Sequence, residues 1–392
     1  MVEESSDEPV PDNGVALVLS GAGARGAYEA GALSVLLPLL TGHDRPRIIV
    51  GTSVGALNAA MLASVIHQGV DVAADALVKS WMSISPEKVF STPRGSAVSA
   101  VRWHLRHRPG TAVGLLDTTP LKDTMAEILG DEDFGHNVGN GQLDGIGIVA
   151  SSCSRSDAVV FVKVRGAAPP DGGRVRYVGT KLGYLHLLAS SAFPIAFPPQ
   201  WVKDDGQAGD WYIDGGVHLN TPLKPAIDLG AVRLLVVGGT ATRPSWRPSP
   251  GLPPDETDGN GQILHSLLVD GLEADLAHLR STNRYLAMLG TGGAQAHQPS
   301  RHRPVKTFVV NPSDDNLNSV AAEVWPAGWK SLLKSCGGYG LLGFVTRQRQ
   351  QPGQFLSYMC FHPDFIRSAI SQGQADARAQ LGGSASLPWM LP

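Results

Sequence analysis

The chain has 392 residues and a formal net charge of −3, with 43% hydrophobic and 17% charged residues. This length and composition suit one large domain with a well-buried core, and the near-neutral charge argues against a nucleic-acid partner. The three cysteines, Cys153, Cys336 and Cys360, have neither the pattern of a disulfide framework nor the spacing of a zinc site, so we expect no metal site.

The acidic N-terminal segment, residues 1–13, lacks the basic start and the apolar core of a signal peptide. We expect it to be a disordered tail. No uninterrupted apolar run in the sequence approaches the ~20 residues of a membrane-spanning helix. The sequence therefore predicts a cytoplasmic protein with no signal peptide and no transmembrane segment, whose contact with a membrane would be peripheral.

The first predicted elements are a buried strand at residues 15–19, a glycine loop at residues 20–26 and a helix at residues 27–37. A second strand, at residues 47–50, leads through the pentapeptide Gly-Thr-Ser-Val-Gly into an Ala-rich helix that ends near Gly69. Two strand–helix units in succession favour a parallel sheet.

Farther along, residues 73–129 have a mostly helical pattern, and two strands with a polar turn between them predict a hairpin added to the sheet. The later predicted elements are strands at 146–150 and 159–164, a helix at 182–189, strands at 211–213 and 232–237, a long helix at 263–289 and a strand at 306–310. Residues 241–261 are rich in proline and glycine, which predicts a loop or lid.

The glycine loop matches the pattern Gly-x-Gly-x-x-Gly with the residues Gly21, Ala22, Gly23, Ala24, Arg25 and Gly26. The pattern is common by chance in a chain with 46 glycines, and a second copy begins at Gly338 without a preceding strand. A glycine loop between a strand and a helix has three interpretations: a binding site for the pyrophosphate of a dinucleotide, an oxyanion hole made of backbone N–H groups, or a tight turn without chemistry. A dinucleotide site needs an acidic residue at the end of the second strand, where this chain has Ser53. We therefore favour the oxyanion hole and expect no cofactor.

Ser53 lies at the centre of the pentapeptide, in the sequence setting of a nucleophile elbow: a strand, a sharp turn and a helix. Gly51 and Gly55 let the turn close without Cβ clashes, and the N-terminus of the following helix would stabilise negative charge near the serine. A helix cap is the structural alternative for this serine. The two flanking glycines and the β-branched strand favour the nucleophile.

A serine nucleophile needs a base. The twelve histidines leave a Ser–His triad open, but in α/β-hydrolases several strands precede the elbow, and here it follows the second strand. Asp214 is the alternative, because it ends a strand, precedes Gly215 and Gly216, and would have its pKa raised by burial. An Asp-Gly turn without chemistry is the competing interpretation. Asp171 also precedes two glycines, but it follows two prolines in a turn that we expect to be exposed.

These three motifs in this order, with Ala-Phe-Pro and Phe-Pro-Pro within residues 192–199, resemble the patatin-like phospholipase family over roughly residues 15–237. The resemblance implies a three-layer α/β/α sandwich with a central, mostly parallel sheet. We expect a catalytic core at residues 14–240 and a C-terminal helical extension at residues 262–392 that completes the domain. Ala22 stands where many members carry glycine, and its backbone N–H is sufficient for an oxyanion hole.

By that resemblance, Ser53 and Asp214 form a catalytic dyad without histidine, and the glycine loop forms the oxyanion hole. The reaction would be the calcium-independent hydrolysis of a lipid acyl ester through an acyl-enzyme, as in a phospholipase A, a lysophospholipase or a carboxylester hydrolase. The expected partner is a lipid or acyl-ester substrate. The alternatives are an acyltransferase, which would pass the acyl group to a thiol or alcohol, and a lipid-binding regulatory module.

Residues 98–108 interleave arginines and histidines with Trp103 and aliphatic side chains. This pattern fits a helix that lies on an anionic lipid surface, which would give the peripheral membrane contact. A solvated surface helix is the alternative.

Overall fold

The computed structural model describes residues 14–91, 116–129, 133–194, 196–203, 208–241, 271–290, 303–314, 316–324 and 354–391. Several expectations fall outside these ranges and stay predictions. They concern the tail at residues 1–13, the stretch at 98–108, the lid apart from Ala241, and residues 263–270 of the long helix.

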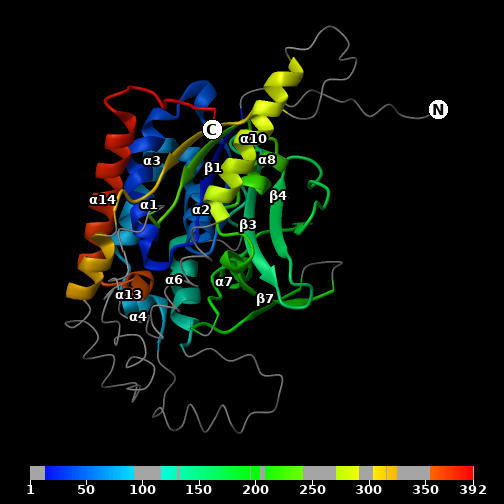
Figure 1. Ribbon diagram of the computed structural model, residues 1–392. Coiled ribbons are helices and arrows are strands. Elements are labelled where there is room, and N and C mark those ends of the chain that lie inside the picture. Colours follow the sequence, from blue (N-terminus) through cyan, green and yellow to red (C-terminus); the bar gives the residue numbers. More distant parts are fainter. Residues whose placement is uncertain are drawn as a thin grey trace, which may run out of the picture.

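The strands of the described residues form one nine-stranded sheet in the order β5-β4-β3-β2-β1-β8-β9, with β7 paired to β3 and β6 paired to β7 (Figure 1). Their bounds are β1 Val15–Leu19, β2 Pro46–Thr52, β3 Gly145–Ser152, β4 Ala158–Val164, β5 Val175–Gly179, β6 Gln200–Val202, β7 Asp210–Asp214, β8 Arg233–Val237 and β9 Lys306–Val310. The adjacent strands β3, β2, β1, β8 and β9 are parallel to one another, and β4 runs parallel to β5. The antiparallel pairs are β3 with β4, the predicted hairpin, β3 with β7, and β6 with β7.

The first two strands are each followed by a helix, and later helices and strands also occur in groups. The bounds of the helices are α1 Gly26–Leu36, α2 Val54–Val65, α3 Val70–Met82, α4 Pro86–Val89, α6 Thr119–Leu129, α7 Tyr184–Ser190, α8 Leu223–Asp228, α10 Gly271–Gly290, α13 Gln354–Met359 and α14 Pro363–Leu381. Within the described ranges, none of the helices combines the length and the apolar character needed to span a bilayer.

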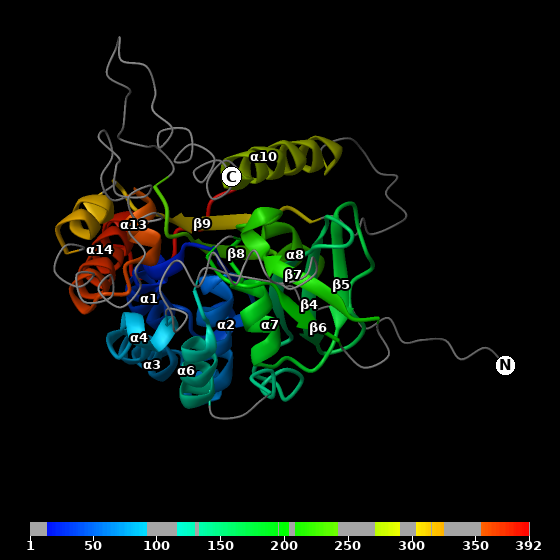
Figure 2. The ribbon, with the colours of Figure 1, turned by 90° about the horizontal axis from the view of Figure 1, so that it is seen from below.

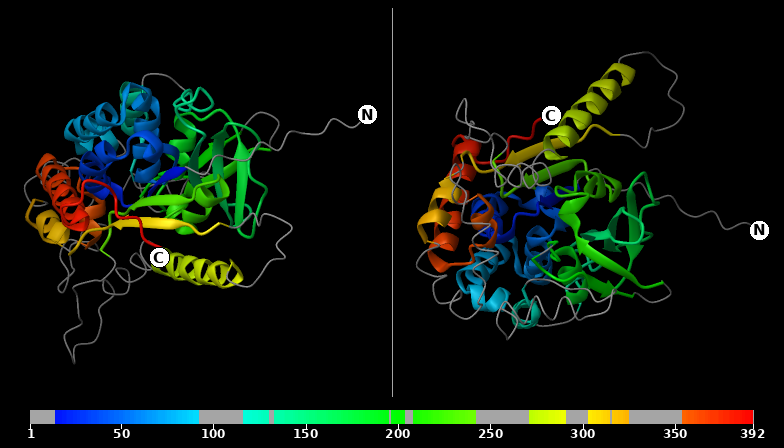
Figure 3. Two further views of the ribbon diagram at one scale, coloured as in Figure 1. Left: turned by 90° about the horizontal axis from the view of Figure 1, so that it is seen from above. Right: turned by 60° about the horizontal axis from the view of Figure 1, so that its bottom comes forward.

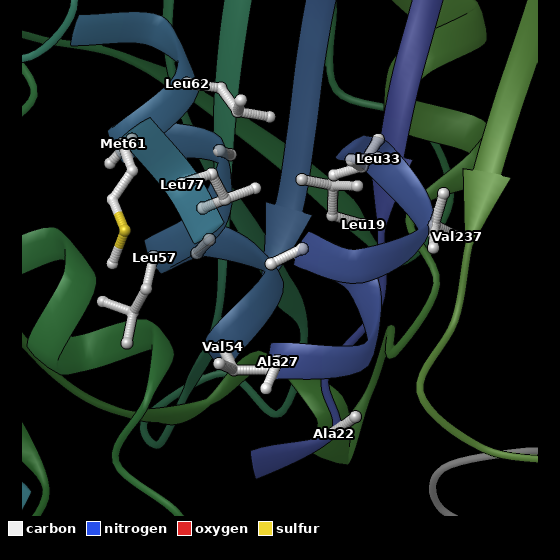
Figure 4. Packing of buried hydrophobic residues seen from close by; sticks show 14 of the residues in the cluster. Leu19, Ala22, Ala27, Leu33, Val54, Leu57, Met61, Leu62, Leu77 and Val237 are labelled. Atoms are coloured by element: carbon white, nitrogen blue, oxygen red, sulfur yellow. The ribbon is translucent and has the colours of Figure 1, made fainter. Parts of the chain in front are cut away.

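Helices cover both faces of the sheet, which gives the expected three layers (Figure 2). Successive side chains of β1 point to opposite faces. Leu17 and Leu19 enter the larger core with α1, α2, α3 and α14, and Figure 4 shows Leu19 there with Leu33 of α1. Ala16 and Val18 enter the second core, under α8 and α10. A strand that is buried on both faces has a continuous apolar sequence, which is why β1 is predictable.

The C-terminal helices α13 and α14 lie against the first elements of the chain (Figure 3). A Cβ on Gly31 of α1 would overlap the carbonyl of Ile370, and a Cβ on Gly373 of α14 would overlap the carbonyl of Tyr28. The Tyr28 hydroxyl donates a hydrogen bond to Asp376 at 3.0 Å. α1 and α14 therefore cross with their backbones in close contact, and α1 is the helix that follows the glycine loop.

Candidate active site

β2 and α2 meet at Ser53, whose backbone has φ 54° and ψ −124°. A positive φ is uncommon for a residue with a Cβ and marks a strained turn that its surroundings hold in place. A Cβ on Gly51 would overlap the carbonyl of Gly55, and a Cβ on Gly55 would overlap the carbonyl of Leu19. The two glycines thus let β1, β2 and α2 converge, and the turn leaves Ser53 half-buried at the carboxyl end of β2.

Asp214 ends β7 and lies opposite Ala150 of β3. Its Oδ2 accepts a hydrogen bond from the Ser53 hydroxyl at 2.5 Å, and its Oδ1 accepts one from the Gly216 backbone N–H at 2.7 Å. The residue is 4% exposed, so the carboxylate has exchanged water for these two donors. The fold thereby brings together two side chains that are 161 positions apart in the sequence.

Burial raises the pKa of the Asp214 carboxyl from 3.8 to about 6, although the hydrogen bonds from Ser53 and Gly216 act in the opposite direction. The cause is desolvation, which disfavours the charged form of a carboxyl group. Asp214 is therefore a stronger base than an exposed aspartate and is still largely ionised at neutral pH. In the described part of the chain, the side chain bonded to the Ser53 hydroxyl is this carboxylate and not an imidazole.

Asp171, the other aspartate before two glycines, lies in an exposed turn, where its Oδ1 accepts a hydrogen bond from the Tyr177 backbone N–H at 2.9 Å. It shapes the start of β5. The described residues contain no group of three or more histidine, cysteine, aspartate or glutamate side chains arranged to hold a metal ion.

The glycine loop lies beside the elbow, because a Cβ on Gly21 would be 3.1 Å from the Cβ of Ser53. Asn220 holds this end of the loop with two hydrogen bonds. Its backbone carbonyl accepts from the Gly21 N–H at 3.2 Å, and its side-chain Nδ2 donates to the Gly21 carbonyl at 3.1 Å. Since Asn220 follows Asp214 closely in the sequence, it ties the loop to the segment that carries the candidate base.

Three of the six backbone N–H groups in the loop are already bonded within the fold, those of Gly21, Arg25 and Gly26. Among the described residues, the other three N–H groups have no such partner, and an oxyanion hole needs donors of this kind. The candidate donors are therefore Ala22, Gly23 and Ala24.

Ser190, at the end of α7, supports the elbow from its other side. Its Oγ accepts a hydrogen bond from the Ser53 backbone N–H at 2.8 Å and donates one to the Val149 carbonyl at 2.5 Å. The N–H of Ser53 is thus engaged in the fold and is not a free donor to an oxyanion.

A buried polar cluster joins the loop to α2. Glu29 of α1 accepts hydrogen bonds from the Ser20 N–H at 3.0 Å and from the Asn58 side-chain amide at 2.8 Å, and Asn58 accepts one from the Trp81 indole at 2.8 Å. Burial raises the pKa of Glu29 well above its ordinary value. The cluster fixes the start of the glycine loop relative to the helix that follows Ser53.

The sequence did not indicate Asn220, Ser190 or Glu29. The sequence holds a weak indication of Asn220: it is a polar residue shortly after Asp214 and before Pro222, in a loop that starts at the same edge of the sheet. Glu29 had another, as a single charge in an otherwise apolar helix. Ser190 is one of two adjacent serines, and nothing in the sequence separates it from Ser191.

The family profile described as patatin-like phospholipase matches residues 17–227. No curated protein matches the chain in sequence. Among solved structures, VipD from Legionella pneumophila is 12% identical with a TM-score of 0.33, and the match covers 95% of this chain and 67% of VipD. Human GIVD cytosolic phospholipase A2, in complex with methyl gamma-linolenyl fluorophosphonate, is 13% identical with a TM-score of 0.42, and the match covers 97% of this chain and 60% of that one.

The match to the family profile extends over more than half of the 392 residues and includes the glycine loop, the elbow and the Asp-Gly-Gly turn. The fold is of the expected class, a mixed α/β architecture with a central, mostly parallel sheet between helical layers. The chain belongs to the patatin-like phospholipase family.

Proposed function

We propose that the protein is a calcium-independent lipid acyl hydrolase in which Ser53 is the nucleophile and Asp214 the general base. The observation that carries the proposal is the 2.5 Å hydrogen bond from the Ser53 hydroxyl to the buried Asp214 carboxylate. The strained elbow and the adjacent loop with three unengaged N–H groups support it. Membership of the patatin-like phospholipase family supports a lipid as the substrate.

In the proposed first step, Asp214 Oδ2 takes the hydroxyl proton while Ser53 Oγ forms a bond to the ester carbonyl carbon. The negative charge moves to the carbonyl oxygen, where the N–H groups of Ala22, Gly23 and Ala24 donate hydrogen bonds. One donor of this kind is typically worth about 3 kcal/mol of the barrier. As the carbonyl re-forms, the bond to the alcohol breaks, and the leaving oxygen takes the proton from Asp214.

In the second step, water attacks the acyl-enzyme, and Asp214 takes one of its protons. The same N–H groups hold the second oxyanion. When the bond to Ser53 Oγ breaks, the proton returns from Asp214 to the serine, and a carboxylic acid is released. One carboxylate thus acts as base and then as acid in each half of the reaction.

The pH profile of kcat/KM is expected to fall on the acid side near pH 6, because protonated Asp214 cannot accept the serine proton. With a pKa of about 6, kcat/KM should be about half of its plateau value at that pH and should fall about tenfold for each further pH unit below it. The measurement uses an uncharged ester, with the released acid quantified by chromatography. A profile that stays level to about pH 4.5 in the folded protein would contradict the role of a buried base.

A fluorophosphonate probe is expected to label Ser53 covalently, which mass spectrometry of the labelled peptide would show. Ser53→Ala should abolish labelling. Ser64 is a matched control on the same helix, because its hydroxyl is bonded to the Met61 carbonyl at 2.8 Å and Ser64→Ala should label like the wild type. Labelling of a different serine, with Ser53 unmodified, would overturn the assignment.

Incubation with a mixed lipid extract separates the function classes, with Ser53→Ala as the reference. Free fatty acid in the wild-type reaction is the result of a hydrolase, and the accompanying lysolipid, glycerol derivative or alcohol identifies the ester. An acylated thiol or alcohol without free fatty acid is the result of an acyltransferase. Vesicle binding without any product is the result of a lipid-binding module, and either of these last two results would replace the proposal.

A further inference from the structure

Arg25 lies in the glycine loop, yet its side chain is turned into the protein and is 2% exposed. Nε and Nη2 donate hydrogen bonds to the Ser357 hydroxyl at 2.9 and 2.7 Å, and Nη1 donates to the Gly239 carbonyl at 3.2 Å. Nη2 also donates to Asn318 Oδ1. The ring of Tyr358 lies 4.4 Å from the guanidinium carbon. The guanidinium is thus held on its edges and on one face.

These partners are all neutral, whereas the guanidinium carries a positive charge. A buried charge is tolerated when hydrogen bonds replace the lost water, and bonds to charged donors are stronger than neutral ones. Loss of one acceptor would leave a buried charged N–H group without compensation. The side chain therefore fixes the loop backbone to which it is attached.

The partners come from outside the part of the chain that matches the family profile, residues 17–227. Asn318 lies in the helical residues 316–324, and Ser357 and Tyr358 lie in α13. The same segment contacts the loop backbone directly, because a Cβ on Gly23 would overlap the Tyr358 carbonyl. In turn, the Tyr358 hydroxyl is 3.0 Å from Thr240 Oγ1, just beyond Gly239.

We propose that Arg25 is a positioning residue that holds the glycine loop against Asn318 and Ser357. Because both partners lie after residues 17–227, the part that matches the family profile, turnover would depend on residues outside that part. The inference rests on the proposed function, since the loop would supply the oxyanion donors. Donors act only when they are held close to the place where the charge develops, and small displacements cost large factors in rate. Ser357 would act through Arg25 and not by touching substrate.

The experiment compares wild type, Ser357→Ala, Arg25→Met and the double variant, with Ser384→Ala as control. Ser384 is exposed in the C-terminal segment, and its hydroxyl bonds the Ser386 carbonyl. For each protein, kcat and KM toward a short-chain ester are measured well below the melting temperature. Hydrogen–deuterium exchange of a peptide covering residues 20–26 is measured in parallel, because that readout needs no catalysis.

We expect Ser357→Ala to lower kcat about tenfold with KM nearly unchanged, and to speed exchange at residues 20–26, while Ser384→Ala changes neither. The double variant should lose no more activity than Arg25→Met alone, because residues that act as one unit are not additive. If Arg25→Met does not fold, Ser357→Ala and its control still decide. Unchanged kcat and unchanged exchange in Ser357→Ala would overturn the positioning role, as would additive losses. Faster exchange in Ser357→Ala, together with a wild-type protein that hydrolyses no ester, would support the positioning role and overturn the proposed function instead.

Discussion

Asp214→Asn is expected to abolish most turnover and, at neutral pH, to make the protein more stable. The loss of turnover follows from the base: an amide keeps the shape of the side chain but cannot accept the Ser53 proton. Since general base catalysis typically contributes 10²–10⁴-fold, we expect kcat to fall about 10³-fold or more. The Gly216 N–H can still donate to the Asn side-chain oxygen, so the turn after β7 should persist.

The gain in stability follows from the raised pKa of Asp214. In the unfolded chain this carboxyl ionises near 3.8, but in the folded protein it ionises near 6, so the folded state binds more protons between these values. Stability therefore falls as pH rises through this window and stays lower above it. At about 1.4 kcal/mol for each pKa unit, the ionised carboxylate lowers the free energy of unfolding by about 3 kcal/mol above pH 7. Asn does not ionise and avoids this cost.

Urea denaturation of wild type and Asp214→Asn at about pH 4 and pH 8 would measure the effect, with kcat measured on the same preparations. The variant should be the more stable protein at the higher pH, and the difference should shrink at the lower one. Asp171→Asn is the matched control, because it changes the other Asp-Gly-Gly sequence in an exposed turn and should affect neither quantity. An Asp214→Asn protein with activity within tenfold of wild type would remove Asp214 as the base.

The sequence predicted the central strands and β9 well but did not predict β5 and β6, for a physical reason. β1, β2 and β8 are buried on both faces along most of their length, so each contains a continuous apolar run, which is typical of a buried strand. β5 was missed because it lies at an edge and has the charged Arg176 as its second residue, and β6 because it has three residues and follows prolines. Partly exposed strands keep a mixed composition that resembles a loop.

The two candidate catalytic side chains, Ser53 and Asp214, were predictable because each lies at the end of a strand beside its own glycines, which are local signals. The residues that hold the glycine loop in place were not predictable. Ser357 and Asn318 reach Arg25 across more than 290 positions, and each is a single polar residue with no pattern around it. Such hydrogen-bond acceptors are determined by proximity in the folded protein, here by the contact of α13 with the glycine loop. Sequence motifs therefore located the candidate site, while the fold was needed to locate the residues that hold the glycine loop in place.

Gly23→Ala is expected to damage both stability and activity, far more than Gly42→Ala. The two glycines have nearly the same left-handed backbone, with φ +56° and +58°, so alanine pays the same conformational cost of about 1–2 kcal/mol at either position. A Cβ on Gly42 meets nothing within 4 Å, whereas a Cβ on Gly23 would overlap the Tyr358 carbonyl. The loop or α13 must then move, and the candidate donors Ala22 to Ala24 move with the loop.

Because loss of one oxyanion donor costs about 10²–10³-fold in kcat, we expect Gly23→Ala to lower kcat by about 10²-fold, with Gly42→Ala close to wild type. The free energy of unfolding from urea denaturation should fall by about 1 kcal/mol in Gly42→Ala and by clearly more in Gly23→Ala. Equal losses of stability in the two variants would mean that α13 does not press on the loop. Wild-type turnover in a folded Gly23→Ala protein would mean that the oxyanion is held elsewhere, because donors on a loop that has moved could not keep their positions.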